Sequence, residues 1–220
     1  MIDPIAVSDR VQAIQEDARR IAGHEVTLIA VTKSFGCDAI AAAVAAHCDG
    51  IGENYAQEVL EKAKADCVKA PLHFIGALQS NKIRPIAPYV AMWQSVDRAS
   101  LVAGIAQHSP GAEVLLQVNT TGEASKSGVD ASGLSDLRQQ AQDAGLVVKG
   151  LMTLGPTSGT RDQRMGAFRT LRALMEEQNL TICSMGMSDD YLEALECGAT
   201  MLRIGSGLFG TRPPKQKSPQ

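Results

Sequence analysis

The segment "LIAVTKSFG" places a lysine directly after an apolar run. Residues 28–32 have the aliphatic and β-branched composition of a buried strand, and the residue that follows them is Lys33. A lysine amine that is partly withdrawn from water has a lowered pKa, and its neutral form attacks carbonyl groups. Lys33 is therefore a candidate for covalent capture of an aldehyde or ketone. The residues leave open a simpler alternative, in which Lys33 extends into solvent or pairs with Glu53.

Small hydroxyl residues and glycines follow two later apolar runs. "SMGMSDD" contains Ser184 and Ser188, and "RIGSG" contains Gly205 and Ser206. Hydroxyls and backbone amides at the ends of the last two strands of a barrel commonly bind phosphate. Ser188 is also expected to be the N-cap of the next helix. The alternative is that both segments are ordinary caps and turns. A ligand with both a carbonyl and a phosphate would be either an aldolase's sugar phosphate or pyridoxal 5′-phosphate (PLP).

Strands and helices are expected to alternate along the chain and to position these residues. The predicted strands are residues 26–31, 50–52, 72–75, 92–96, 114–118, 147–152, 181–184 and 201–204. The predicted helices are residues 5–22, 38–47, 54–65, 98–107, 133–144, 161–178 and 188–197.

Apolar strands without alternation, each followed by a helix, are typical of a parallel sheet covered by helices. Eight such units close into a (β/α)₈ barrel, whose functional residues lie at the C-terminal ends of the strands. We therefore predict an α/β fold, a single-domain (β/α)₈ TIM barrel over residues 1–212 with an N-terminal helix. Residues 213–220, within the segment "RPPKQKSPQ", are expected to form a disordered tail. A doubly wound open sheet is the alternative, but no GxGxxG follows the first strand.

Composition argues against several classes of function. The net charge is −3 and aromatic residues make up 4% of the chain, which disfavours binding to nucleic acid. The N-terminus lacks the basic and apolar regions of a signal peptide, and no apolar run would span a bilayer. We expect a cytoplasmic protein without membrane contact. The five cysteines show no CxxC spacing and are expected to be reduced thiols, and the four scattered histidines predict no metal site.

Six stretches of the sequence resemble the pyridoxal phosphate homeostasis proteins, a family of PLP-binding proteins. In chain order they are "AVTK", "IGENYAQE", "HFIGALQSNK", "LLQVNTTGEASKSGV", "GLMTL" and "SMGMSDDYLEALECGATMLRIGSGLFGTR". They are spread in order over residues 28–212, nearly the whole chain, and the last stretch is the most specific. The resemblance implies a barrel similar to the N-terminal domain of alanine racemase, with PLP held as a Schiff base on Lys33.

The resemblance also implies roles for further residues. Asn54 would lie near the cofactor ring, and Arg203 would face the pyridine nitrogen. Ser184, Ser188, Gly205 and Ser206 would lie around the phosphate, and Met185 would be a further cofactor-binding residue. Lys82 and Lys126 fall in the "QSNK" and "SKSG" motifs, where a solvated basic rim and a PLP transit site are both open.

Three positions depart from the family pattern. Phe35 stands where many members have a second lysine, so any role of that amine is absent. Ser206 replaces the more usual threonine, which keeps a hydroxyl for the phosphate. "MTLGP" replaces a run similar to Ile-Pro-Ala-Pro, so the sixth loop is expected to differ in shape.

The implied site favours a carrier over an enzyme. An arginine that donates to the pyridine nitrogen makes the ring a poorer electron sink. Racemases of this fold add a tyrosine from another domain, whereas Tyr55, Tyr89 and Tyr191 are expected in packing positions. Our first hypothesis is a monomer that buffers PLP or delivers it to PLP-requiring apoenzymes, with little or no turnover. The alternatives are a PLP-dependent amino-acid racemase or lyase of low activity, and a Schiff-base aldolase without PLP.

Overall fold

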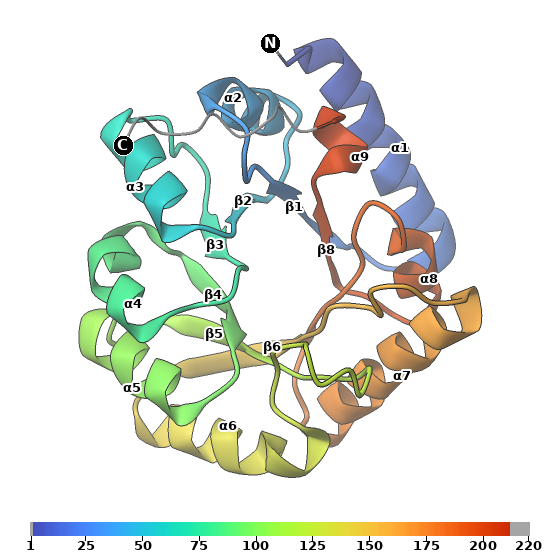
Figure 1. Ribbon diagram of the computed structural model, residues 1–220. Coiled ribbons are helices and arrows are strands. Elements are labelled where there is room, and N and C mark those ends of the chain that lie inside the picture. Colours follow the sequence, from blue (N-terminus) through green and yellow to red (C-terminus); the bar gives the residue numbers. More distant parts are fainter. Residues whose placement is uncertain (1, 212–220) are drawn as a thin grey trace.

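Eight parallel strands form a closed barrel in the order β1 to β8. The computed structural model describes residues 2–211, and Figure 1 looks along the barrel with the helices on its outside. The strands are β1 (Thr27–Val31), β2 (Gly50–Glu53), β3 (Leu72–Phe74), β4 (Met92–Val96), β5 (Glu113–Gln117), β6 (Val147–Met152), β7 (Ile182–Ser184) and β8 (Met201–Ile204). The predicted barrel and all eight predicted strands are confirmed. The predicted tail, residues 213–220, lies outside the described residues.

The helices cover the outer face of the barrel. They are α1 (Pro4–Ala22), α2 (Cys37–Ala45), α3 (Ala56–Lys64), α4 (Ser80–Ile86), α5 (Ala99–His108), α6 (Leu134–Asp143), α7 (Arg161–Glu177), α8 (Tyr191–Glu196) and α9 (Ser206–Phe209), with short 3₁₀ turns η1 (Ala87–Tyr89) and η2 (Ala131–Gly133). Helices were expected between all the strands, but no bounds were predicted for α4 and α9. Both are short, and α4 contains Pro85, which argues against a helix when sequence is considered alone.

Two local predictions are wrong. Ser188 does not cap α8, which begins three residues later at Tyr191 with Asp190 at the N-cap position. The Asp190 carboxylate instead accepts a 2.6 Å hydrogen bond from the backbone of Met187. Cys37 and Cys67 form a disulfide, so the expectation of five reduced thiols fails for this pair. They lie 30 residues apart in sequence, and only the fold brings the start of α2 beside the turn after α3.

Helix α1 lies along the outside of the barrel beside α8 and α9 (Figure 1). Its start is capped by the Asp3 carboxylate, and Gly23 ends it in the left-handed conformation. Arg10 donates a 2.7 Å hydrogen bond to the carbonyl of Leu208 in α9. These contacts fasten α1 to the part of the barrel that follows β8. No helix within residues 2–211 has the length and apolar character needed to cross a membrane.

The barrel interior has an apolar layer and a polar layer. Five buried side chains, from β1, β4, β5, β6 and β8, pack together as the apolar layer: Ile29, Met92, Leu115, Met152 and Met201. The buried polar side chains of His73, Gln94, Ser184 and Arg203 connect to one another through hydrogen bonds inside the same barrel. This polar layer carries the functional site.

Gly150 of β6 pairs with Ile182 of β7, and its replacement by alanine tests the close packing of these two strands. A Cβ atom at this residue would lie 2.0 Å from the carbonyl oxygen of Ile182, a backbone atom that has little freedom to move. We expect Gly150→Ala to lower the free energy of unfolding by about 1–3 kcal/mol, as overpacking does. Urea denaturation measures the effect.

Gly166→Ala is the matched control in α7, because no heavy atom of the described residues, apart from the neighbouring backbone of its own helix, lies within 4 Å of the added methyl group. This variant should gain about 0.5–1 kcal/mol from the lower flexibility of its unfolded chain. Equal stability of the two variants would contradict the close β6–β7 packing.

Candidate cofactor-binding site

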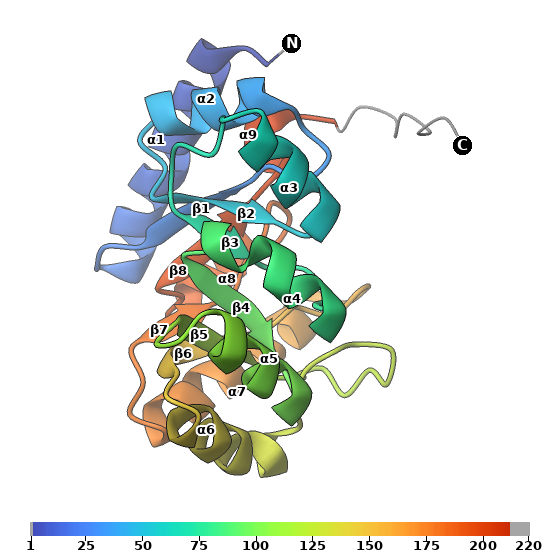
Figure 2. The ribbon, with the colours of Figure 1, turned by 90° about the vertical axis from the view of Figure 1, so that its left-hand side faces the viewer.

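A cavity of about 860 Å³ opens at the C-terminal ends of the strands. Its walls come from segments after seven of the eight strands, with β4 the exception among the described residues. The loop after β5 and the loop before α7 lie on the same side of the barrel (Figure 2), where Glu123 accepts hydrogen bonds from Thr157. Six of the eight predicted cofactor-binding residues line this cavity: Lys33, Asn54, Ser188, Arg203, Gly205 and Ser206. The structure therefore brings these six residues together at one cavity, and their role in binding a cofactor stays a prediction.

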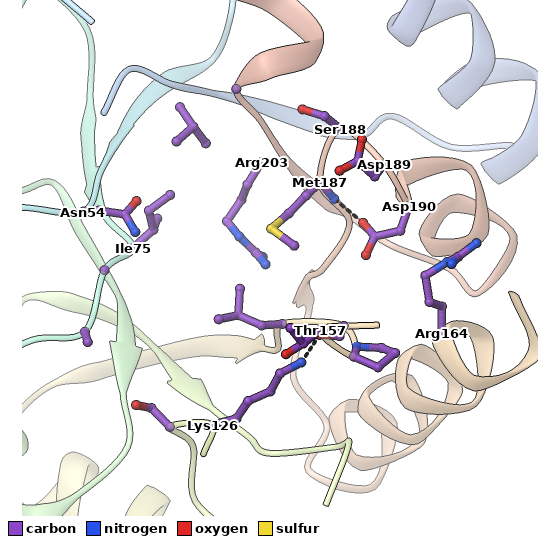
Figure 3. A pocket seen from close by; sticks show the side chains of 18 of the residues that line it. Asn54, Ile75, Lys126, Thr157, Arg164, Met187, Ser188, Asp189, Asp190 and Arg203 are labelled. Carbon is purple, nitrogen blue, oxygen red and sulfur yellow. Dashed lines mark hydrogen bonds between the residues drawn. The ribbon is translucent and has the colours of Figure 1, made fainter. Parts of the chain in front are cut away.

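The side chain of Arg203 extends into the middle of the cavity (Figure 3). The residue is only 2% exposed, and its guanidinium group donates to the Ser184 hydroxyl at 2.6 Å and to the Thr153 carbonyl at 2.7 Å. Burial lowers the pKa of Arg203 to about 10, so the group keeps its positive charge at neutral pH. The cavity thus contains a fixed cationic hydrogen-bond donor.

A chain of hydrogen bonds runs from Arg203 to His73 through the barrel. The Ser184 hydroxyl accepts from Arg203 and donates to the Gln94 side-chain oxygen at 2.7 Å, and the Gln94 amide lies 2.8 Å from His73 Nδ1. Burial lowers the pKa of His73 to about 4, so the ring is neutral at pH 7. A neutral Nδ1 accepts from the Gln94 amide, and this donation turns the Gln94 oxygen toward Ser184.

Ser184 and Met185 lie behind the cavity wall. Both are fully buried, and neither lines the cavity. The Ser184 hydroxyl is occupied by Arg203 and Gln94, and the Met185 backbone amide donates to the Met201 carbonyl. In this structure Ser184 therefore positions Arg203, and the predicted contact of Ser184 with phosphate stays a prediction.

The loops after β7 and β8 meet at the cavity edge. The Gly207 amide donates a 2.9 Å hydrogen bond to the Ser188 hydroxyl, which joins the two loops. Gly205 approaches the carbonyl of Val31 so closely that an added Cβ would lie 3.3 Å from it. Ser206 is exposed to the cavity side. These small residues leave room for an oxyanion next to two hydroxyl groups.

Asn54 supplies an unused polar atom on the opposite wall (Figure 3). Its side-chain oxygen is buried and has no hydrogen-bond partner among the described residues. A buried acceptor without a partner costs about 1–3 kcal/mol, which a bound polar ligand would recover. Gly76 packs against this residue so tightly that a Cβ there would lie 2.1 Å from the Asn54 carbonyl oxygen.

The loop that carries Lys33 is held by two charged residues of α3. Lys62 is buried and donates to the Thr32 carbonyl at 2.7 Å, while the Glu58 carboxylate accepts from the Ser34 amide at 2.7 Å. Lys62 also pairs with buried Glu53, and burial raises the pKa of that carboxyl. The backbone on both sides of Lys33 is therefore fixed from α3.

The other lysines and the tyrosines occupy different surroundings. Lys126 lines the cavity, donates to the Gly155 carbonyl and lies 3.5 Å from Glu123, whereas Lys82 is exposed on α4 and outside the lining. Tyr191 donates to Asp17 between α8 and α1, and burial raises its pKa to about 12. None of the three tyrosines lines the cavity within the described part of the chain.

Sequence reasoning missed Gln94, His73 and Thr153 as supports of the site. A signal was present for Gln94, because a polar residue interrupts the apolar strand "MWQSV". His73 interrupts "LHF" in the same way. In a barrel, such residues either face its interior or contact the covering helices.

Comparisons with known proteins by sequence and by structure point to the same family. The family model described as alanine racemase, N-terminal domain, matches residues 2–213. The pyridoxal phosphate homeostasis protein of Pseudomonas aeruginosa is 40% identical, with 92% of this chain and 93% of that protein aligned. The structure of PipY from Synechococcus elongatus with PLP bound is 31% identical, covers 93% of this chain and all of its own, and has a TM-score of 0.79.

Alanine racemase from Corynebacterium glutamicum shares the fold. Its structure has a TM-score of 0.76 at 16% identity, with 99% of this chain and 64% of that chain aligned. The similarity to an alanine racemase N-terminal domain is confirmed.

The hydrogen bond between Gln94 and His73 predicts a specific pH dependence. The pKa of His73 is near 6.5 in the unfolded chain and about 4 in the folded protein, so the unfolded state takes up the proton first as the pH falls. Stability from this residue is complete above pH 6.5 and decreases toward pH 4. By pH 5 the loss should reach about 2 kcal/mol relative to pH 8. Urea denaturation of wild type and His73→Asn at both pH values measures this difference.

His24→Asn, at an exposed histidine, is the control and should keep the wild-type dependence. If His73→Asn loses as much stability as wild type between pH 8 and pH 5, His73 is not the neutral acceptor described above.

Proposed function

This chain belongs to the pyridoxal phosphate homeostasis proteins within the alanine racemase N-terminal domain family, and we propose that it binds PLP and acts in PLP homeostasis. The observation that carries the proposal is the composition of one cavity. An amine, a buried cationic donor and a cluster of hydroxyls and glycines line it together. The PLP-bound structure of the 31% identical PipY supports the same ligand.

The residues present fit PLP group by group. Lys33 would hold the aldehyde as a Schiff base, and Arg203 would donate to the pyridine nitrogen. Ser188, Gly205 and Ser206 would hold the phosphate, while the unused oxygen of Asn54 would meet the polar ring. When bound, PLP supplies an electrophilic aldehyde and an electron-accepting ring. The cavity lining also includes Asp189 and Asp190, and the Asp190 carboxylate accepts a hydrogen bond from the Met187 amide.

The same residues favour retention of PLP over turnover. Arg203 stays charged at neutral pH, so its guanidinium group would donate a hydrogen bond to the ring nitrogen and would not accept a proton from it. The ring then withdraws less charge from a reacting amino acid. The wall also lacks a tyrosine that would move a proton, as far as residues 2–211 define it. A racemase or lyase of low activity is therefore not favoured, and steady amino-acid turnover that Lys33→Ala abolishes would establish it.

We propose further that the protein works as a monomer in the cytoplasm and passes PLP to PLP-requiring apoenzymes. The lining of the cavity supports the monomer, because residues of one chain supply all the groups that PLP needs. A partner subunit has nothing to complete. Sedimentation of the PLP-loaded protein tests this state, and a stable dimer at micromolar concentration would overturn it.

Borohydride reduction tests the covalent link. We expect PLP-loaded protein to absorb visible light and, after reduction and digestion, to carry the cofactor mass on the peptide that contains Lys33. Lys33→Ala should lose the visible band, because no other amine replaces it at this position. Lys126→Ala is the control from the opposite wall of the cavity and should keep the label on Lys33. A label found only on Lys82 or Lys126 would contradict the assignment.

Ser206→Ala tests the phosphate contact. Loss of one hydrogen bond to a charged group should weaken PLP binding by about 1.5–3 kcal/mol, while the melting temperature of the unloaded protein stays unchanged. Fluorescence titration with PLP measures the affinity. Ser125→Ala, at an exposed serine on the other side of the cavity, should bind like wild type. Unchanged affinity in Ser206→Ala would reduce this serine to a turn residue.

A further inference from the structure

The disulfide between Cys37 and Cys67 joins two segments that both determine the position of Lys33. Cys37 begins α2, four residues after Lys33, and Cys67 lies in the turn that follows α3. Both residues are partly exposed, so small molecules reach them from solvent. The proposed function uses neither cysteine.

The disulfide closes a ring of contacts around the Lys33 loop. The Cys67 amide donates to the Lys62 carbonyl at 3.1 Å, and the Lys62 amine donates to the Thr32 carbonyl at 2.7 Å. From Thr32 the chain passes through Lys33 to Cys37, where the disulfide returns to Cys67. The loop is therefore fixed at one end by a charged hydrogen bond and at the other by a covalent bond.

The backbone of this loop has a conformation that the disulfide helps to maintain. Ser34 has φ of 66°, a left-handed conformation that is unfavourable for a non-glycine residue and persists only when its surroundings hold it. Glu58 of α3 holds the Ser34 amide. Phe35 packs against Phe209 of α9 with ring centroids 5.2 Å apart, so the loop also contacts the helix that starts at Ser206. Motion of this loop would therefore displace both the Lys33 amine and the cavity edge at Ser206.

We propose that Cys37 and Cys67 are a redox-modified pair, and that their disulfide strengthens retention of the cofactor by fixing the Lys33 loop to α3. The inference rests on the proposed function, since the ligand retained is PLP. Oxidation by a small disulfide such as glutathione disulfide removes two electrons and two protons from the two thiols. One thiolate attacks the small disulfide and releases one small thiol, and the second protein thiolate then displaces the other. Reduction returns the two thiols and frees the loop.

Three free cysteines provide an internal contrast. Cys183 and Cys197 are buried, and Cys48 is partly exposed but has no disulfide partner. Burial raises the pKa of the Cys48 thiol to about 12, which keeps it protonated and slow to react. Among the cysteines, then, the pair beside the Lys33 loop is the one suited to reversible oxidation.

The test compares PLP release from the full chain in its two redox states. Protein oxidised with glutathione disulfide, and protein reduced with a phosphine that is then removed, are each loaded with PLP. The phosphine takes up the oxygen of one water as it delivers two thiols, and it adds no thiol that would itself react with PLP. Release into an excess of a PLP-requiring apoenzyme is followed by the activity that this enzyme gains. We expect release from reduced protein to be roughly tenfold faster, which corresponds to about 1.4 kcal/mol.

Cysteine variants distinguish the effect of the disulfide on PLP release from other effects of oxidation. Cys37→Ser and Cys67→Ser should each release PLP at the reduced wild-type rate under both conditions, and Cys48→Ser should respond to oxidation like wild type. Mass spectrometry after alkylation of the denatured protein should find three modifiable thiols in oxidised protein and five in reduced protein.

Two results would overturn the inference: equal release from the two redox states, or five modifiable thiols after oxidation. Failure of both redox forms to bind PLP would instead contradict the proposed function, so the two failures are distinguishable.

Discussion

The structure of the site depends on one buried positive charge. Moving a guanidinium group out of water costs several kcal/mol unless hydrogen bonds and nearby charge compensate it. Arg203 satisfies this requirement with the Ser184 hydroxyl and the Thr153 carbonyl, and the negative charge of Asp190 opposes the effect of burial on the pKa of Arg203. The barrel interior therefore contains a polar layer where an apolar core would otherwise continue. Two hydrogen bonds hold the guanidinium group of Arg203 in its observed orientation.

The polar layer also explains the neutral histidine. If His73 were protonated, its Nδ1 would be a donor facing the donating amide of Gln94. The Gln94 side chain would then turn over, and its oxygen would no longer accept from Ser184. Burial prevents this by lowering the pKa of His73 to about 4. An apolar strand interrupted by one glutamine thus fixes a hydrogen-bond direction that extends across the barrel to Arg203.

The sequence predicted the barrel and most of the cavity because these depend on local patterns. Strand–helix alternation is readable from composition, and parallel strands bring their C-terminal ends to one face, so Lys33, Asn54 and Ser206 were placed together correctly. Contacts between distant segments were not predictable in this way. The Cys37–Cys67 disulfide and the Lys62–Thr32 hydrogen bond depend on how α3 packs beside the loop after β1. Ser188 was misassigned as an N-cap because an Ser-Asp-Asp run suits a helix start, while the fold uses its hydroxyl to join two loops.

An aromatic contact joins the Lys33 loop to the end of the barrel that follows β8. Phe35 packs on Phe209, so an apolar contact connects the loop after β1 with α9. A tilted aromatic pair at this distance contributes about 0.5–1.5 kcal/mol beyond the area it buries. The contact carries no charge and cannot bind phosphate, so its effect is to hold Lys33 and Ser206 at a fixed separation. On the proposed assignment of Lys33 to the aldehyde and Ser206 to the phosphate, which are a fixed distance apart in PLP, an arrangement that maintains this separation would favour capture of the intact cofactor.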